Sequence, residues 1–151
     1  MIDLYAYCNR MLKDLISIPS FEEKQFPGIQ EYILDELRDS GCEASVDRTS
    51  DCIIGRKSAN PDARTLLLSA HFDTVVPTTA WTMDPLNPLE KGGRIYGLGS
   101  SDCKGGIVSI LAALKKAKPS NNVVVVITGY EDMKKVVSGK QYRGADLIPG
   151  H

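Results

Sequence analysis

His71 and Asp73 are the two residues of this chain whose types and spacing point most clearly to chemistry. His71 directly follows the largely apolar segment 66–70, and Asp73 lies two residues further along. A neutral imidazole nitrogen binds a metal ion well, while a carboxylate on the other ring nitrogen sets the tautomer and the orientation of the ring. We therefore expect His71 to be a metal ligand rather than a core or surface histidine.

Asp102 lies in a second segment that suits a metal site, the glycine-rich residues 97–106. An aspartate just before a predicted helix most often caps that helix, and this is the simpler explanation for Asp102. The glycines, however, allow the backbone to approach an ion closely. Together with His71, they favour a ligand role for Asp102.

Glu131 and Asp132 form a third candidate group, a few residues after the apolar residues 123–127. Locally, a solvated acidic pair explains them as well as a catalytic role does. Ligands of open α/β sheets gather outside the carboxyl ends of the strands. We therefore expect the acidic pair, Asp102 and His71 to converge on one edge of a sheet.

The elements that must position these residues are three helices and four strands. Periodicity predicts helices over residues 2–18, 25–40 and 103–118, and strands over residues 42–48, 52–56, 66–70 and 123–127. The pair Gly92-Gly93 predicts a hairpin turn, whereas residues 133–151 show no pattern that settles their structure. The run 66–70 is apolar except for Ser69, which is typical of a strand covered on both faces. The run 123–127 indicates the most clearly buried strand of the chain. Strands alternating with helices predict an α/β layered fold with a largely parallel sheet.

The composition is that of a soluble globular domain, with 151 residues, 42% of them hydrophobic, and a net charge of -1. No basic field is available to bind nucleic acid or an anionic membrane, and no apolar run reaches the length of a membrane span. The four cysteines are widely spaced at Cys8, Cys42, Cys52 and Cys103. Since the N-terminus shows no export signal, we expect free thiols and a cytoplasmic protein.

Five segments resemble the motifs of one family, the co-catalytic zinc amidohydrolases and peptidases. That family includes acetylornithine deacetylase, succinyl-diaminopimelate desuccinylase, aminoacylase and the glutamate carboxypeptidases. The segments are Leu-Ile-Ser-Ile-Pro-Ser at 15–20, His-Phe-Asp-Thr-Val-Val-Pro at 71–77, Trp81 with Asp-Pro-Leu at 84–86, the glycine-rich run at 93–106, and Thr-Gly-Tyr-Glu-Asp at 128–132. The resemblance implies a three-layer αβα catalytic domain with a mixed, mostly parallel sheet, of which residues 1–151 are the N-terminal portion.

The resemblance also implies a role for each candidate residue. His71 would bind one zinc ion, and Asp73 would hold its ring by a hydrogen bond. Asp102 would bridge two zinc ions, with a cis peptide bond after it, and cobalt or manganese could substitute for zinc. Asp132 would bind the second ion, and Glu131 would be the general base that takes a proton from water. The implied reaction is hydrolysis of a linear amide bond in a small N-acyl amino acid or peptide.

Several positions depart from the family pattern. Tyr130 replaces an acidic residue, Asp132 is one carbon shorter than the usual glutamate, and residues 133–151 form a divergent tail without the next ligand motif. The shorter side chain matters because metal–ligand distances are tight to ~0.2 Å. Leu98 and Cys103 stand where the family often has arginine and methionine, and neither is expected to bind metal.

Family members are more than twice as long and add a lid or dimerisation domain and a second half of the catalytic domain. We therefore expect a truncated form that is poorly active or inactive alone, with exposed edges that favour homodimerisation or other association. The alternative is a non-catalytic remnant or partner-binding module with weak or no metal binding. A nucleotide-binding domain is a more distant option, because Gly97-Leu98-Gly99 resembles a dinucleotide fingerprint that lacks its third glycine here.

Overall fold

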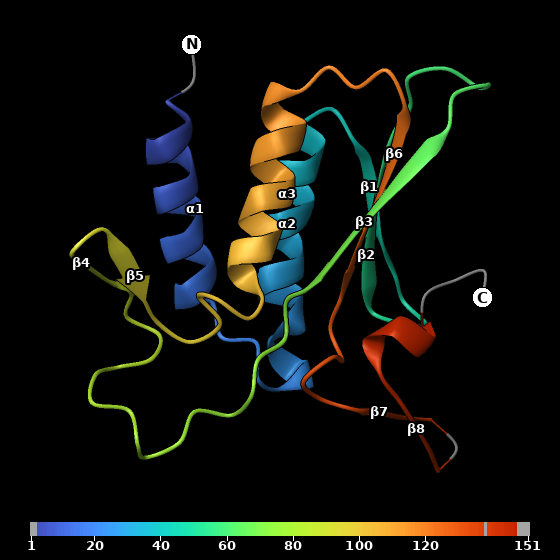
Figure 1. Ribbon diagram of the computed structural model, residues 1–151. Helices are drawn as coiled ribbons and strands as arrows, with labels where there is room; N and C mark the ends of the chain where they lie inside the picture. Colours follow the sequence, from blue (N-terminus) through green and yellow to red (C-terminus); the bar gives the residue numbers. More distant parts are fainter. Residues whose placement is uncertain (1–2, 138, 148–151) are drawn as a thin grey trace.

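The computed structural model describes residues 3–137 and 139–147, which form an α/β fold (Figure 1). Its helices are α1 (Leu4–Ser17), α2 (Phe26–Asp39) and α3 (Lys104–Lys116), with the short 3-10 helices η1 (Glu23–Gln25) and η2 (Gly144–Leu147). Its longer strands are β1 (Glu43–Asp47), β2 (Cys52–Lys57), β3 (Thr65–His71) and β6 (Asn122–Thr128). These elements confirm the helices and strands that periodicity predicted.

Two small hairpins complete the described elements: β4 (Leu89–Lys91) with β5 (Arg94–Tyr96), and β7 (Lys135–Val137) with β8 (Lys140–Tyr142). The first hairpin turns at Gly92 and Gly93, as predicted, and both glycines have positive φ angles that few other residues adopt. The second hairpin and η2 lie in the tail for which no structure was predicted. Residues 148–151, at the end of that tail, lie outside the described residues.

The four longer strands form one mixed sheet in the order β1-β2-β6-β3. β3 runs parallel to β6, whereas the pairs β1–β2 and β2–β6 are antiparallel. The sheet is mixed, as expected, but the prediction that it is mostly parallel is wrong for the described strands. Only residues 48–51 join β1 to β2, and a link this short can connect only antiparallel strands. The connection from β3 to β6 is longer and contains helix α3, which allows these two strands to run parallel.

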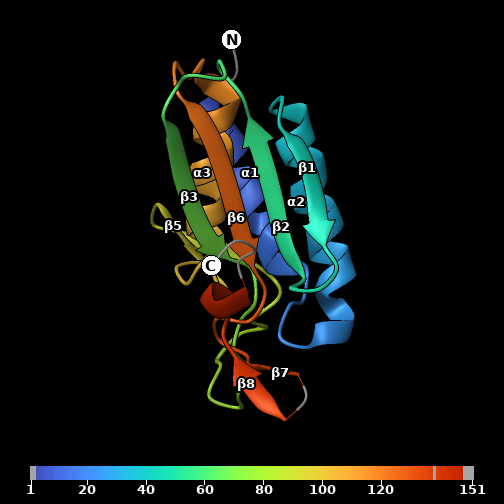
Figure 2. The same ribbon diagram turned by 90° about the vertical axis from the view of Figure 1, so that its right-hand side faces the viewer.

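All three α-helices lie on one face of the sheet (Figures 1 and 2), where they share one core with residues such as Ile33 and Val125. In the part of the chain that the structure describes, no α-helix covers the opposite face, and Leu67 of β3 is 53% exposed. The prediction that residues 66–70 are covered on both faces is therefore wrong here, because β3 is an edge strand beside a single helical layer. None of the described helices is long and apolar enough to cross a bilayer.

Three tyrosine hydroxyl groups stabilise this arrangement by donating hydrogen bonds to carboxylates. The pairs are Tyr7 with Glu36 at 2.7 Å, Tyr32 with Asp14 at 2.9 Å, and Tyr130 with Asp51 at 2.8 Å. Burial raises the pKa of each of these phenols above its ordinary value of 10.0, and the hydrogen bond to a carboxylate raises it further. The folded protein therefore keeps three phenol protons at a pH where the unfolded chain loses them.

The first prediction is that the free energy of unfolding falls as the pH rises above about 10, since the folded state then binds more protons than the unfolded state. Replacing both Tyr7 and Tyr32 by phenylalanine should make this fall less steep. Urea unfolding of the two proteins between about pH 9 and 11 measures the slopes. Equal slopes would contradict the prediction.

Candidate metal centre

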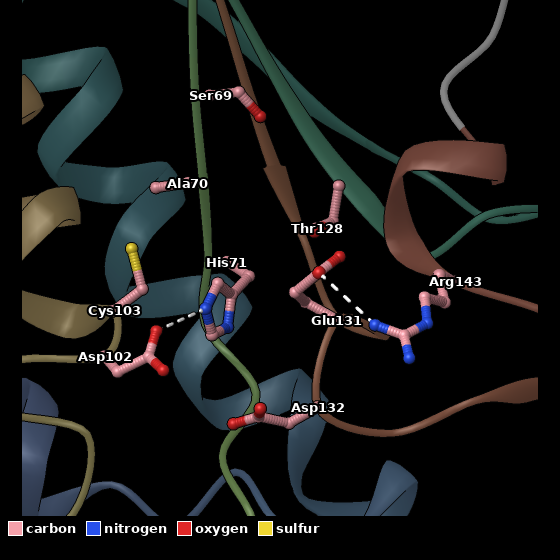
Figure 3. A pocket seen from close by; sticks show the side chains of 9 residues that line it. All are labelled: Ser69, Ala70, His71, Asp102, Cys103, Thr128, Glu131, Asp132 and Arg143. Atoms are coloured by element: carbon pink, nitrogen blue, oxygen red, sulfur yellow. Dashed lines mark hydrogen bonds and ion pairs between the residues drawn. The ribbon is translucent and has the colours of Figure 1, made fainter.

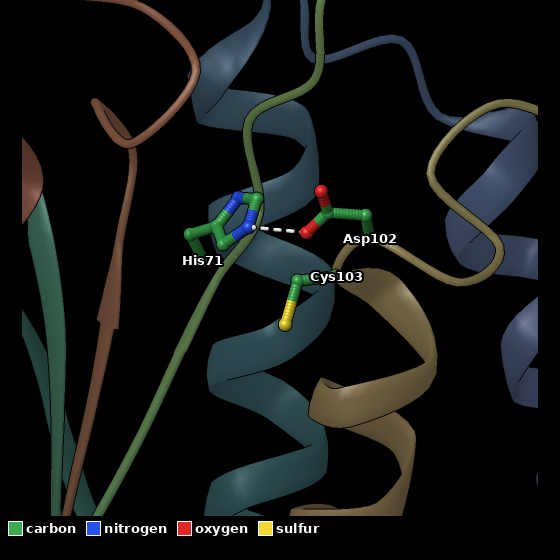
Figure 4. Close-up of side chains that lie close together, drawn as sticks. All are labelled: His71, Asp102 and Cys103. Carbon is green, nitrogen blue, oxygen red and sulfur yellow. Dashed lines mark hydrogen bonds and ion pairs between the residues drawn. The ribbon is translucent and has the colours of Figure 1, made fainter.

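His71 and Asp102 face each other between the end of β3 and the start of α3 (Figure 4). The ring nitrogen Nε2 of His71 lies 3.0 Å from Oδ1 of Asp102. Cys103 joins this group, because one donor atom from each of the three residues lies within 4.8 Å of the other two. The expected cis peptide bond between Asp102 and Cys103 is present. Nitrogen, oxygen and sulfur donors this close together suit a single zinc-like ion.

The group borders a pocket of about 460 Å³ at the carboxyl ends of β3 and β6 (Figure 3). The residues that line the pocket are Ser69, Ala70, His71, Asp102, Cys103, Thr128, Glu131, Asp132 and Arg143. His71 and Thr128 are partners in the parallel register of the two strands, so the segments that follow them start side by side. The fold thus brings the proposed metal ligands and the acidic pair to one edge of the sheet.

Asp73 holds the ring of His71 on the side away from Asp102. Nδ1 of His71 lies 3.1 Å from the backbone oxygen of Asp73 and 3.3 Å from its carboxylate Oδ1. Burial lowers the pKa of His71, but the hydrogen bonds to Asp73 and Asp102 outweigh burial and raise it to about 9. Because Asp73 holds the Nδ1 side of the His71 ring, Nε2 points towards Asp102. A histidine that binds a metal through Nε2 needs this orientation.

Asp73 also organises the loop after β6, a role that no sequence pattern indicated. Its side chain is fully buried, and its carboxylate accepts hydrogen bonds from three successive backbone N–H groups. Glu131 donates to Oδ1 at 3.2 Å, while Asp132 and Met133 donate to Oδ2 at 2.8 and 2.9 Å. Asp73 therefore connects the segment that carries His71 to the loop that carries both acidic candidates.

Glu131 and Asp132 line the pocket but are not members of the three-residue group. The carboxylate of Glu131 faces the guanidinium of Arg143, with Oε1 3.8 Å from Nη1 (Figure 3). Burial raises the pKa of Asp132, His71 opposes that rise, and the two neighbouring carboxylates add to it. The charge of Asp132 therefore interacts with the charges of His71 and Asp102, although its carboxylate is not one of the three clustered donor groups.

Lys104, the first residue of α3, attaches the Asp102 segment to the end of α1. Its side chain is fully buried, and its ammonium group donates to the backbone oxygens of Leu15 at 2.8 Å and Ile18 at 2.9 Å. A cation at a helix C-terminus is favoured by the helix dipole, although burial lowers the pKa of Lys104 to about 8. These contacts restrict the position of the neighbouring Asp102.

Sequence reasoning missed Cys103, Lys104 and Arg143 as parts of this site. Cys103 could have been identified, because a thiol beside a proposed zinc ligand is itself a common zinc ligand. Lys104 is buried by contacts with a helix almost ninety positions away, which periodicity does not report. Arg143 belongs to the divergent tail, where no motif gave a signal.

Comparison with known proteins places these observations in a family context. Residues 67–147 match the model described as Peptidase family M20/M25/M40. A cysteinylglycine-S-conjugate dipeptidase from Corynebacterium striatum is 41% identical over 91 residues, which cover 56% of this chain and 20% of that protein. A succinyl-diaminopimelate desuccinylase from Nautilia profundicola is 28% identical over 147 residues, which cover 93% of this chain and 40% of that protein. The chain thus spans less than half the length of these curated relatives.

Solved structures share the fold at lower sequence identity. Human carnosine dipeptidase 1 superimposes with a TM-score of 0.75 at 18% identity, over 85% of this chain and 33% of that chain. A metallo-carboxypeptidase of the M20 family from Sulfolobus solfataricus gives a TM-score of 0.72 at 21% identity, over 85% of this chain and 31% of that chain. The described residues therefore have the fold of about one third of these peptidases.

Proposed function

Because the chain belongs to peptidase family M20/M25/M40, we propose that it supplies the metal-binding part of a zinc-dependent hydrolase. The proposed reaction is cleavage of an amide bond in a small N-acyl amino acid or peptide. Relatives named as a dipeptidase and a desuccinylase support this reaction class. Since the chain spans less than half the length of these relatives, we further propose that it turns over such substrates poorly on its own.

The contact between His71 and Asp102 carries this proposal. An imidazole nitrogen and a carboxylate oxygen 3.0 Å apart, at the rim of an open pocket, are donors that zinc prefers. The support of the imidazole by Asp73 is the outer-shell arrangement that orients a ligating histidine. The residues present therefore fit a zinc ion with His71 and Asp102 as ligands, and Asp132, which lines the same pocket, would bind a second ion.

A zinc ion held by His71 and Asp102 would polarise the carbonyl group of the substrate and would make a water molecule more acidic. Glu131 takes the proton of the attacking water and delivers it to the leaving amine, as a general base and then a general acid. The N–H groups of the Glu131 segment are bound to Asp73, so this loop is held beside the ligands. Arg143 faces Glu131 and helps to fix the position of its carboxylate.

A second candidate function is a non-catalytic module that pairs with another polypeptide. Strand β3 supports it, because within the described sheet β3 has a neighbour on one side only, and Leu66 and Leu67 are 51% and 53% exposed. Exposed apolar edge strands pair readily with other chains. Zinc affinity distinguishes the two candidates, since a partner-binding module has no need of a zinc ion.

The second prediction is that Asp102→Asn abolishes zinc binding without disturbing the fold, because the Asp102 side chain is 82% exposed. Zinc at a hundred times its dissociation constant should stabilise the wild-type chain by about 2.7 kcal/mol and should not stabilise the variant. Thermal unfolding with zinc and with a chelator measures this difference.

Asp84→Asn provides the matched control, because the exposed Asp84 carboxylate accepts one hydrogen bond from the N–H group of Leu86 and does not line the pocket. This control should bind zinc as the wild type does. If Asp102→Asn were stabilised by zinc as strongly as the control, the proposed metal site would be wrong.

A further inference from the structure

The thiol of Cys103 lies beside the two proposed ligands (Figure 4). It is half-buried and lines the pocket, whereas Cys42 and Cys52 are buried and do not. Donor atoms of a tetrahedral zinc ion are about 3.5 Å apart, given bonds of about 2.0–2.3 Å. Since the three donor atoms already lie within 4.8 Å of one another, a common ion requires closure of about 1 Å. The Asp102 side chain is 82% exposed and is therefore free to turn towards a shared ion.

Gly106 keeps open the space that the sulfur occupies. A Cβ atom added at position 106 would lie 2.9 Å from Sγ of Cys103, closer than real carbon atoms approach. The next nearest atom is Cβ of Ala70 at 4.0 Å, an ordinary contact. An alanine at position 106 would therefore push against the thiol of Cys103.

We infer that Cys103 is a third ligand of the ion held by His71 and Asp102, which makes this position a nitrogen, oxygen and sulfur site for a thiophilic divalent cation. This inference rests on the proposed function and identifies the class of metal that the site takes. On binding, the thiol gives up its proton to solvent and the sulfur forms a bond to the cation. A thiolate ligand favours zinc, cobalt or cadmium over manganese or magnesium, which prefer oxygen donors.

The third prediction concerns the metal preference of the full 151-residue chain, with Cd²⁺ and Mn²⁺ as the probes. Cd²⁺ should produce a thiolate-to-metal charge-transfer band in the near ultraviolet, and Cys103→Ser should remove this band. The same variant should weaken Cd²⁺ binding by at least about tenfold. Loss of an outer-shell partner of a metal ligand already weakens binding by about this factor, and loss of a ligand itself should cost no less. Its affinity for Mn²⁺ should stay within about twofold of the wild type, because serine keeps an oxygen donor at the site.

Two controls separate loss of the ligand from loss of the fold. Cys8→Ser removes another half-buried thiol, one that lines a different pocket, and should retain the band. Gly106→Ala keeps the thiol but displaces it, and should weaken the band although alanine favours the helix. Unfolding would lower the affinity for both metals, so a selective loss of Cd²⁺ affinity reports on the sulfur.

The outcomes distinguish this inference from the proposed function. If the wild-type chain binds Cd²⁺ and Mn²⁺ with equal affinity and without the band, Cys103 is not a ligand, while the metal site stands. A band that persists in Cys103→Ser also overturns the inference. If the folded wild-type chain binds neither metal, both the inference and the proposed metal site are wrong.

Discussion

Replacing Asp73 by asparagine is expected to lower the free energy of unfolding by about 3–5 kcal/mol, the cost of breaking a buried charged pair. The carboxylate accepts from three backbone N–H groups, and Nδ1 of His71 lies 3.3 Å from it. Asparagine has nearly the same shape, but one of its terminal atoms is an NH₂ group that only donates. Either orientation of the amide sets this group against N–H donors, and each buried unpaired donor costs about 1–3 kcal/mol.

The loop over residues 131–133 should lose its order at the same time. Urea unfolding gives the change in stability, and hydrogen exchange at the three loop amides reports the local opening. Asp84→Asn is the control, since this exposed aspartate accepts a single backbone bond and should change stability by less than about 1 kcal/mol. Wild-type stability and slow exchange in Asp73→Asn would show that the buried carboxylate does not organise the loop.

Gly129→Ala is expected to destabilise the protein by about 2–3 kcal/mol through overpacking. A Cβ atom at this position would lie 2.5 Å from Cζ of Phe72 and 2.8 Å from Cε2 of Phe26. Both rings are buried and pack edge to face with their centroids 4.8 Å apart, so neither can move aside freely. Because Phe72 directly follows His71, displacement of the Phe72 ring should also move the imidazole and weaken zinc binding.

A smaller residue at position 72 should relieve this contact. The double variant Gly129→Ala/Phe72→Leu should lose less free energy of unfolding than the two single variants lose together. Urea unfolding of the wild type, the two single variants and the double variant measures this coupling. Gly28→Ala is the control. Gly28 lies in helix α2, and a Cβ atom at this position would be 3.8 Å from Cγ2 of Ile18, which is an ordinary van der Waals contact. This control should keep or slightly raise stability. Strictly additive costs would exclude the proposed clash.

Both predictions concern the place where β3 and β6 end together. The N–H group of Phe72 donates to the backbone oxygen of Thr128 at 2.9 Å, so the parallel pairing continues one residue beyond the register of His71. Gly129 allows the aromatic side chain of Phe72 to pack beneath this junction, and Asp73 fastens the next loop to it. The position of the proposed metal centre therefore depends on packing under the strand ends as much as on the ligands.

The sequence by itself determined the local elements and the principal candidate residues. Apolar periodicity located α1, α2, α3 and the longer strands, because each element must bury one face or stripe. Ligand-type residues at a strand end and before a glycine-rich helix start pointed to His71 and Asp102, which the fold brings to 3.0 Å. These inferences succeeded because they depend on residues close together in the chain.

Only the tertiary structure decided which strands pair antiparallel, which face of β3 is exposed, and which side chains complete the site. Asp73 binds N–H groups about sixty positions away, and Lys104 binds carbonyl groups of a helix that precedes it by almost ninety. Arg143 reaches Glu131 from a tail without any motif. Periodicity reports that a face is buried but not what buries it, because the partner is selected by the packing of distant segments.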